Sequence, residues 1–436
     1  MKLRPLRAPI FVAFTSLASF ASLTSLGYGA EPPSQAPVAD PAKPLASVLQ
    51  SFVDKHIAPG VVALVANKDG VLALEKAGYA SLADKTPIRD DAMFWIASMS
   101  KSLTGAALMI LVDEGKVSLD DPVEKYLPEF KGQMVAGSDG QDAPHPPKHP
   151  ITVREIMDHI SGLVLANEKT LKNTHVLKDD VADYAAHPLR QEPGTKYEYN
   201  NCGINTGGRI IEVVSGMPYG DFMQRRLFDP LGMKDTTCWP NEEQASRLAH
   251  TARFTEDKKD LVEIKLDPSV NARLIEKLSL GVHVPAAITG DMGFGIAGDY
   301  GQHYAMPAGG YFSTAHDLSL LCRMLLRGGE LEGKHYLSEK AVHTMSSNQT
   351  GDVKVSPQEG YGVGVSVKLK DEEGPAVGSF GHRGARRTAM WIDPRNGLAM
   401  IILVERFDMP GEQQTVMYGD FMKAAVAKFG AAAASR

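Results

Sequence analysis

Two β-hairpin signals lie near opposite ends of the chain, and they constrain the fold more than any other feature. The first is VVALVANKDGVLALEKAGYA, in which two apolar runs flank Asp69-Gly70, a pair that favours the tight turns of hairpins. The second is TAMWIDPRNGLAMIILVE, which turns at Asn396-Gly397. We therefore expect one body of mixed type whose sheet is assembled from both ends of the chain.

The segment between the hairpins differs in character. From about residue 120 to 317 it carries helix caps, helical signals and long loops rich in Pro and Gly. Near the C-terminus, residues 413–429 repeat apolar side chains at helical spacing and are expected to lie on the sheet. We therefore predict an α+β domain over residues 45–430. Its sheet body would span about 45–119 and 318–430, and its mostly helical part about 120–317.

The first 30 residues are typical of a secretory signal peptide. Three basic residues precede an apolar, Ser/Ala-rich run, and small residues lead to Ala30. Residues 31–44 then read as a Pro/Ala-rich linker. We expect cleavage and export to the periplasm or the exterior, and an uncleaved anchor is the alternative. The apolar run is short for a membrane span, and the rest of the chain contains no stretch of spanning length.

The composition limits which partners and cofactors are expected. Net charge is -6 without a basic face, so nucleic acid is not an expected partner. The cysteines, Cys202, Cys238 and Cys322, are widely spaced and form no metal pattern. His145 and His149 lie in a Pro-rich stretch that favours a solvated loop over a metal pair. We predict no metal, and the sequence gives no oligomeric state.

The stretch FWIASMSKSLTGAALMILVDEGK places reactive groups at the start of a predicted helix. Ser98 falls at or near the N-terminus of that helix, Gly115 is its expected C-cap, and Lys101 shares the face of Ser98. The helix N-terminus favours negative charge near the serine oxygen. An amine packed among apolar side chains has a lowered pKa and can act as a base. The alternative is a serine N-cap with a solvated lysine, because Ser-x-x-Lys alone is a weak pattern.

Two further motifs supply complementary groups. Tyr199 and Asn201 precede a helix expected to begin near Gly203. A phenol can relay protons, and an amide two residues later can orient a substrate carbonyl. His382 and Gly384 stand at the start of the second hairpin, where a glycine lets a substrate run along the strand edge and the next N–H can serve an oxyanion. Each motif is common alone, but the three in this order are hard to obtain by chance.

With these residues assembled, the chain resembles the serine β-lactamase-related family: class C β-lactamases, D-Ala-D-Ala carboxypeptidases and family VIII esterases. The likeness extends from about residue 45 to 428. Besides the three motifs it rests on the segments ITVREIMDHISGL, FDPLGMKDT, AGGYFSTAHDL and LLRGGELEGKHYLS. The resemblance implies a β-lactamase/transpeptidase-like fold, with an antiparallel sheet flanked by helices, a mostly helical domain beside it, and the active cleft between them. We read His159 and Ser161 as structural residues that fix a loop.

The resemblance also implies roles for the motif residues. Ser98 would be the acylated nucleophile, and Lys101 and Tyr199 would share the general-base work. Asn201 would hold the substrate amide or carbonyl, and the N–H groups of Ser98 and Ala385 would form the oxyanion hole. The implied reaction is two acyl transfers, from a small ester or amide to serine and then to water, without a metal or organic cofactor.

The third motif separates the members of this family. Dedicated β-lactamases carry Lys-Thr-Gly where this chain has His382-Arg383-Gly384, and histidine is largely neutral at pH 7. We therefore place carboxylesterase first, then D-Ala-D-Ala carboxypeptidase or D-aminopeptidase, then β-lactamase. A slow-turnover penicillin-binding sensor is the alternative from another class. Arg383, with Arg386 and Arg387 after it, is a candidate to bind an anionic substrate end, unless these arginines are solvated or ion-paired.

Overall fold

The computed structural model describes most of the chain from residue 44 onward. The predicted signal peptide, and all but the last residue of the predicted linker, lie outside the described residues. Within the part that is described, no helix combines the length and the apolar character needed to cross a bilayer. The described ranges are 44–137, 143–165, 176–264, 304–371 and 374–431.

Strands gather toward both ends of the chain, and helices are frequent between them. The strands are β1 (Gly60–Ala66), β2 (Val71–Ser81), β3 (Thr86–Pro87), β4 (Phe94–Trp95), β5 (Ala252–Phe254), β6 (Leu261–Glu263), β7 (Phe312–Ser313), β8 (Glu330–Leu331), β9 (Lys334–His335), β10 (Glu359–Tyr361), β11 (Ser366–Lys368), β12 (Phe380–Arg383), β13 (Ala389–Asp393) and β14 (Leu398–Val404). The α-helices are α1 (Leu45–Asp54), α2 (Ser100–Asp113), α3 (Val153–Met157), α4 (Leu177–Ala185), α5 (Asn201–Ser215), α6 (Tyr219–Met223), α7 (Asp229–Leu231), α8 (Glu242–Ala245), α10 (Ala315–Leu326), α11 (Glu339–Ser346) and α12 (Gly411–Phe429). Shorter turns are η1 (Ala97–Met99), η2 (Val123–Lys125), η3 (Pro128–Phe130) and the π-helical η5 (Gln224–Phe228).

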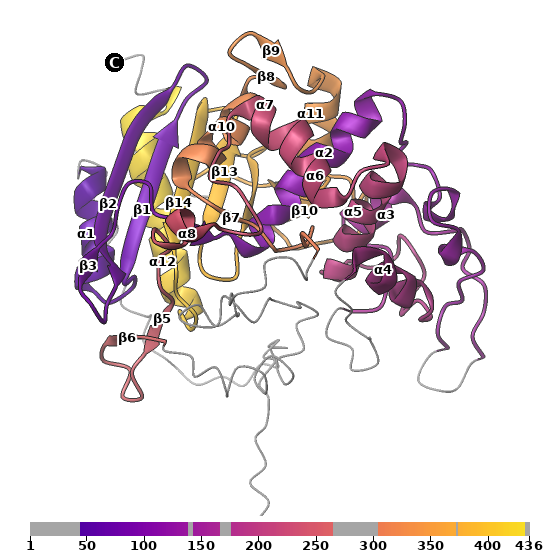
Figure 1. Ribbon diagram of the computed structural model, residues 1–436, viewed down its shortest axis with the longest axis horizontal. Helices are drawn as coiled ribbons and strands as arrows, with labels where there is room; N and C mark the ends of the chain where they lie inside the picture. The colour runs from indigo at the N-terminus through magenta and orange to yellow at the C-terminus, as the bar shows by residue number, and fades with distance from the viewer. Residues whose placement is uncertain (1–43, 138–142, 166–175, 265–303, 372–373, 432–436) are drawn as a thin grey trace, which may run out of the picture. The chain divides into compact units, whose positions relative to one another are not determined.

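The main sheet is antiparallel and has eight strands in the order β10-β11-β12-β13-β14-β1-β2-β3. Its centre joins the two ends of the chain, because β1 pairs with β14 and Val61 lies opposite Val404. In Figure 1 the indigo strands of the N-terminal part lie beside the yellow strands of the C-terminal part. Both predicted hairpins are confirmed, since β2 pairs with β1 across Asp69-Gly70 and β14 pairs with β13 across Asn396-Gly397.

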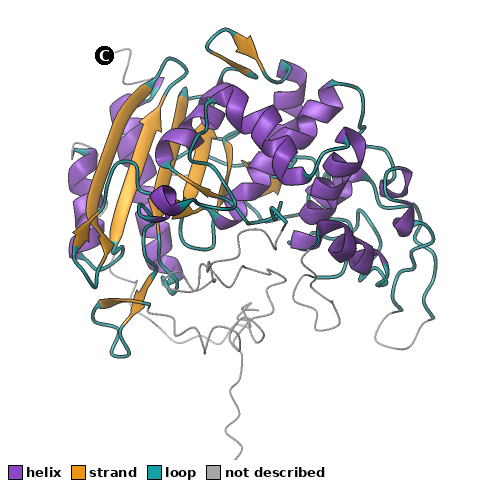
Figure 2. Ribbon diagram, viewed as in Figure 1, coloured by secondary structure: helices purple, strands orange, loops and turns teal. Residues whose placement is uncertain are grey.

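Helices cover both faces of this sheet (Figure 2). On one face α1 and α12 pack against the odd-numbered residues of β1, such as Val61 and Ala63, and against Trp391 of β13. On the other face Val62 and Leu64 join the core that contains α2 and α10. Both faces of β1 are therefore buried, which explains why its sequence is a continuous apolar run and does not alternate with polar residues. The α+β architecture predicted from the sequence is confirmed.

The helical part of the domain begins after α2. A capping box at Thr152 and Glu155 starts α3, the kind of local signal that fixes a helix start. Helix α5 then contacts α2, α3, α4 and α6 and forms the centre of this part. Three short strands, β5 to β7, fall within the predicted helical range of 120–317, and residues 265–303 of that range lie outside the described residues.

The structure places the three cysteines in the interior and the two loop histidines, His145 and His149, beside carboxylates. All three cysteines are buried free thiols, and Cys202, the second residue of α5, is packed in the core. Nδ1 of His145 lies 3.7 Å from a Glu192 carboxylate oxygen, and Nε2 of His149 lies 3.5 Å from one of Glu155. These histidines therefore face separate carboxylates.

Candidate active site

Ser98 lies in the turn η1, which leads directly into α2. Its Oγ is 3.0 Å from Nζ of Lys101, one helical turn later. The lysine side chain is fully buried, and its Nζ also donates a hydrogen bond of 2.7 Å to the carbonyl oxygen of Ala308. The alternative of a solvated lysine is therefore not what the structure shows. The serine oxygen has a buried amine within hydrogen-bond reach.

Burial changes the protonation of that amine. Removal from water lowers the pKa of Lys101 well below its ordinary value of 10.5, because the charged form loses its hydration. The acceptor that faces the amine, the Ala308 carbonyl oxygen, is neutral and does not replace the hydration of a charged amine. The amine is thus suited to accept a proton from a neighbouring hydroxyl.

The backbone around Ser98 is held in a conformation that a free chain would avoid. Ala97 has a φ of +45°, which is uncommon for a residue with a side chain. Two hydrogen-bonded segments hold this turn: β4 pairs with β7, and the N–H of Ile96 donates to Tyr311 O at 3.0 Å. Such local strain persists only where surrounding contacts determine the geometry, as they do at many functional sites.

Tyr199 stands over the amine of Lys101, with 4.8 Å between Nζ and the ring centroid. Burial raises the pKa of the Tyr199 phenol, because the charged phenolate loses hydration. Its interaction with the Ser98 hydroxyl acts in the opposite direction and lowers the pKa. The residue remains 42% exposed, so solvent limits the effect of burial. The phenol thus joins the hydroxyl of Ser98 and the amine of Lys101 in one cluster, although Tyr199 belongs to a distant segment of the chain.

The neighbours of Tyr199 fix its position. His159, which has a φ of +67°, accepts a hydrogen bond of 3.1 Å at Nδ1 from the N–H of Asn200, and its ring lies 4.5 Å from that of Tyr199. Asn200 caps α5 by accepting a hydrogen bond from the N–H of Cys202, and its side-chain amide donates to the carbonyl oxygens of Leu163 and Val164. Asn200 was not predicted to act in the site, although its position directly before a helix is a typical capping signal.

His382 completes the cluster from β12, with its ring 6.2 Å from that of Tyr199. Its Nδ1 is 2.7 Å from the Arg383 carbonyl oxygen, and its Nε2 is 2.8 Å from the hydroxyl of Tyr361. Because a carbonyl can only accept, the proton lies on Nδ1 and Nε2 accepts from Tyr361. Burial, together with the nearby Lys101, lowers the pKa of His382 to about 3. This position of the site therefore carries no positive charge at neutral pH.

Comparison of the chain with known proteins identifies its family. The family model described as Beta-lactamase matches residues 45–418. The chain belongs to the beta-lactamase family of serine hydrolases. A Mycobacterium tuberculosis protein is 27% identical over 383 residues, which cover 82% of this chain and 88% of the relative. A Salmonella typhimurium protein named putative D-alanyl-D-alanine carboxypeptidase is 26% identical over 394 residues, 83% of each chain.

Solved structures show the same fold. EstCE1, described as a hydrolase with promiscuous acyltransferase activity, superimposes with a TM-score of 0.68 at 20% identity, covering 88% of this chain and 97% of its own. Simvastatin synthase LovD from Aspergillus terreus gives a TM-score of 0.70 at 19% identity over 90% and 99%. A penicillin-binding protein homolog from Caulobacter crescentus gives 0.66 at 20% identity over 87% and 96%. The predicted β-lactamase/transpeptidase-like fold is confirmed.

In this beta-lactamase family member, the turn after β12 lies directly against the segment that leads to Ser98. A Cβ atom on Gly384 would lie 2.1 Å from Thr388 Oγ1 and 2.5 Å from the Ile96 carbonyl oxygen. Only glycine fits so close an approach. The next residue, Ala385, is exposed, and its N–H donates to no acceptor among the described residues. That N–H is thus available to an incoming oxygen.

Asn201 is the first residue of α5 and is half-buried. Its side-chain Oδ1 is buried and has no hydrogen-bond partner in the described part of the chain. Buried polar atoms are almost always paired, so an unpaired one needs an explanation. A bound ligand that donates a hydrogen bond would supply the partner, and the role of Asn201 in substrate binding stays a prediction.

The structure does not bring the candidate arginines to Ser98. Side chains alternate along β12, so His382 faces the α2 side while Arg383 faces α12, where it pairs with Glu359 at 3.0 Å. Arg386 is buried with its Nε 3.3 Å from a Glu405 oxygen, and Arg387 donates to the Gln414 side chain. We therefore remove Arg383 from the candidate substrate site, and all three arginines have protein partners.

Asn205 was missed at the sequence level. It lies fully buried one turn after Asn201 on α5, and its Oδ1 accepts a hydrogen bond of 3.1 Å from the N–H of Ala308. The carbonyl of the same Ala308 accepts the hydrogen bond from Lys101. Asn205 is therefore a positioning residue that acts through Ala308. The segment AGGYFSTAHDL was noted as part of the resemblance, but nothing in its sequence identified Asn205 as its partner.

We expect Asn205→Leu to lower the free energy of unfolding by about 1–3 kcal/mol, because the Ala308 N–H loses its buried acceptor. The turnover number should also fall while KM stays nearly constant, since the Ala308 carbonyl no longer orients Lys101. Urea denaturation and steady-state kinetics on a neutral ester measure the two effects. An unchanged kcat in the destabilised variant would show that Asn205 is structural only.

Proposed function

We propose that this protein is a serine hydrolase that cleaves a small carboxylic ester or amide through an acyl-Ser98 intermediate. The observation that supports this most directly is the distance of 3.0 Å between Ser98 Oγ and the buried amine of Lys101. Serine alone is a weak nucleophile, and an adjacent base with a lowered pKa activates it. The match to the beta-lactamase family over residues 45–418 supports the same chemistry.

The first half of the proposed reaction acylates Ser98. As its oxygen attacks the substrate carbonyl, its proton passes to the neutral amine of Lys101, and the N–H groups of Ser98 and Ala385 hold the oxyanion. Tyr199, placed over the amine, passes its proton to the leaving alcohol or amine and takes up the proton that Lys101 received, so that both groups are neutral again. The unpaired Oδ1 of Asn201 can only accept, so it would hold a substrate that brings an N–H or O–H group, such as an amide.

The second half releases the acyl group to water. A water molecule takes the place of the departed alcohol or amine, and Tyr199 with Lys101 removes its proton as it attacks the acyl carbon. Ser98 then leaves with a proton returned from the same pair, and a carboxylic acid is released. The same groups serve both halves, because the second step is the reverse of the first with water in place of the leaving group.

The charges of the site favour neutral esters over substrates with a carboxylate. A permanent cation at the third motif would attract such a carboxylate, but His382 is neutral and Arg383 faces the opposite side of the sheet. The description of EstCE1 as a hydrolase with acyltransferase activity supports acyl-transfer chemistry on this fold. D-Ala-D-Ala carboxypeptidase is the second candidate, which the name of the Salmonella relative supports, and β-lactamase is the third.

A substrate panel tests the proposal and ranks its variants. Wild type and Ser98→Ala are assayed with p-nitrophenyl esters, a D-Ala-D-Ala peptide and a chromogenic cephalosporin. Turnover of the neutral esters that is lost in Ser98→Ala supports the proposal. Turnover of none of the three overturns it. Mass spectrometry after brief incubation with a penicillin separates the sensor function, because a persistent adduct on Ser98 without ester turnover would identify a penicillin-binding sensor.

The proposal includes export, which rests on the basic, apolar and small-residue pattern of the first 30 residues. We expect the secreted or periplasmic fraction to contain a shortened chain whose N-terminus lies between residues 28 and 31. N-terminal sequencing of each cell fraction measures this. An intact N-terminus in a membrane fraction would support the uncleaved anchor, and an intact N-terminus in the cytoplasm would refute export.

A further inference from the structure

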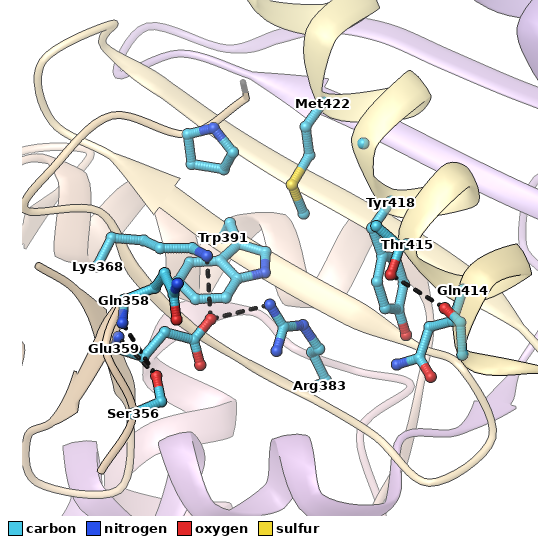
Figure 3. A pocket seen from close by; sticks show the side chains of 13 residues that line it. Ser356, Gln358, Glu359, Lys368, Arg383, Trp391, Gln414, Thr415, Tyr418 and Met422 are labelled. Carbon is cyan, nitrogen blue, oxygen red and sulfur yellow. Dashed lines mark hydrogen bonds and ion pairs between the residues drawn. The ribbon is translucent and has the colours of Figure 1, made fainter. Parts of the chain in front are cut away.

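A cavity of about 520 Å³ opens between α12 and the strands β10 to β13. It lies on the face of the sheet away from Ser98, because its floor is Trp391, which packs with α1 and α12, whereas the helix that follows Ser98 belongs to the core on the other face. The volume falls within the range of pockets that hold small organic ligands. Figure 3 shows side chains from the strands and from α12 directed toward this space.

The centre of the cavity is Arg383, which lies between Trp391 and Tyr418 and points toward Glu359 (Figure 3). Its guanidinium carbon is 5.3 Å from the ring centroid of Trp391 and 5.8 Å from that of Tyr418. Nη2 donates to Glu359 Oε1 at 3.0 Å. Because the two rings and the carboxylate hold the guanidinium in one orientation, its remaining N–H groups are presented in a fixed direction.

Two buried donors at this place have no acceptor among the described residues. They are Nε of Arg383 and Nε1 of Trp391, whose side chain is completely buried. Both groups can only donate, so neither can satisfy the other. Both atoms are covered from solvent, so a ligand in the cavity would meet the outer guanidinium of Arg383, whose side chain is 39% exposed. A guanidinium can only donate hydrogen bonds, so the ligand must bring acceptor oxygens.

The walls indicate the rest of the ligand. Tyr418 and Met422 supply apolar surface from α12, and Trp391 supplies it from β13. A planar oxygen pair that accepts from a guanidinium edge is a carboxylate, and Arg binds it more strongly than it binds a neutral carbonyl. We propose that this cavity is a second binding site, separate from Ser98, for a small organic acid with an apolar or aromatic body.

The site can be probed directly with benzoate, with benzamide as its neutral counterpart. The whole chain is titrated with each compound, and binding is followed by calorimetry and by tryptophan fluorescence. We expect saturable binding of benzoate, and binding of benzamide at least tenfold weaker. Ser98→Ala should bind benzoate like the wild type, which distinguishes this cavity from the catalytic centre and makes the test independent of the proposed function.

Two pairs of variants locate the binding. Arg383→Gln should weaken benzoate binding at least tenfold, whereas Arg395→Gln, at an exposed arginine paired with Asp371 outside the cavity, should not change it. Thr415 lines the cavity from the exposed surface of α12. Thr415→Glu should weaken binding by repulsion, and Thr415→Gln, of the same size but uncharged, should weaken it less. This second pair keeps the test valid if Arg383→Gln folds poorly.

Three results would contradict the proposed acid-binding site or a part of it. No saturable binding of benzoate at millimolar concentration would overturn the proposal. Equal affinity for benzamide would overturn the carboxylate assignment. Equal losses in Arg383→Gln and Arg395→Gln, or in both Thr415 variants, would show that the acid binds elsewhere or binds non-specifically.

Discussion

Lys101→Met is expected to lower kcat/KM for neutral esters by about 10³-fold, within the range that a general base contributes. Methionine fills a similar volume without an amine, so Ser98 Oγ loses the base that lies 3.0 Å away. The free energy of unfolding should not fall together with the activity. Burying an amine costs free energy, and burying the apolar side chain of methionine does not carry that cost. Ester kinetics and urea denaturation of the same preparation measure the two effects.

The pH dependence of Lys101 has a definite sign. Burial lowers its pKa in the folded protein well below 10.5, whereas the unfolded chain keeps the ordinary value. Between these two pKa values the unfolded state binds more protons, so the free energy of unfolding should rise with pH across that window. Activity should follow the same direction, since the base is lost as pH falls through the lowered pKa. In Lys101→Met this part of both profiles should disappear.

The control for this prediction is Lys116→Met. Lys116 lies just beyond the other end of α2, its side chain is 52% exposed, and it pairs with Glu114 on the surface. The Lys116→Met variant should keep the ester kinetics and the pH dependence of the wild type, because an exposed ion pair contributes little to the free energy of unfolding. Equal kinetics for Lys101→Met and Lys116→Met would contradict the role that we give to the buried amine.

Gly384→Ala should both destabilise the protein and remove most of its activity. The added Cβ would lie 2.5 Å from the carbonyl oxygen of Ile96 and 2.1 Å from Thr388 Oγ1. A hydroxyl can rotate away, but the backbone oxygen of Ile96 cannot move without moving the turn that carries Ser98. We expect a loss of about 1–3 kcal/mol in the free energy of unfolding. A larger loss in kcat than in substrate affinity should accompany it, because Ala385 is pushed away from Ser98.

Gly70→Ala is the matched control. Gly70 belongs to the first hairpin turn, and a Cβ there would meet no atom within 4 Å. Its variant should keep wild-type kinetics and nearly wild-type stability. Thermal unfolding and ester kinetics of the two alanine variants compare the same chemical change in crowded and open surroundings. Normal activity in Gly384→Ala would show that the turn tolerates displacement and that our account of it is mistaken.

Much of the fold follows from local signals in the sequence. The Asp-Gly and Asn-Gly turns mark both hairpins, because their backbone geometry suits those residues wherever the rest of the chain goes. The helix after Ser98 and the C-terminal helix over 413–429 are also present, as α2 and α12. The i to i+3 spacing of Ser98 and Lys101 likewise fixes their shared face, since it depends only on helix geometry.

Other features depend on contacts between distant segments and could not be predicted in this way. Burial of the Lys101 amine requires the Ala308 carbonyl, which in turn requires Asn205 on another helix. The neutral state of His382 requires the hydroxyl of Tyr361 and the surrounding core. Protonation is set by the whole environment of a group, not by its neighbours in the chain.

The sequence by itself determined the sheet built from both ends, the helix that follows the serine, and the residues available for acyl transfer. Only the tertiary structure decided which way those residues face. Along β12 a shift of one position exchanges the two sides of the sheet. His382 therefore joins Tyr199 beside Ser98, while Arg383 pairs with Glu359 in a separate cavity. The physical reason is that strand alternation is known from sequence, but the face that receives each side chain is set by the layers packed on either side.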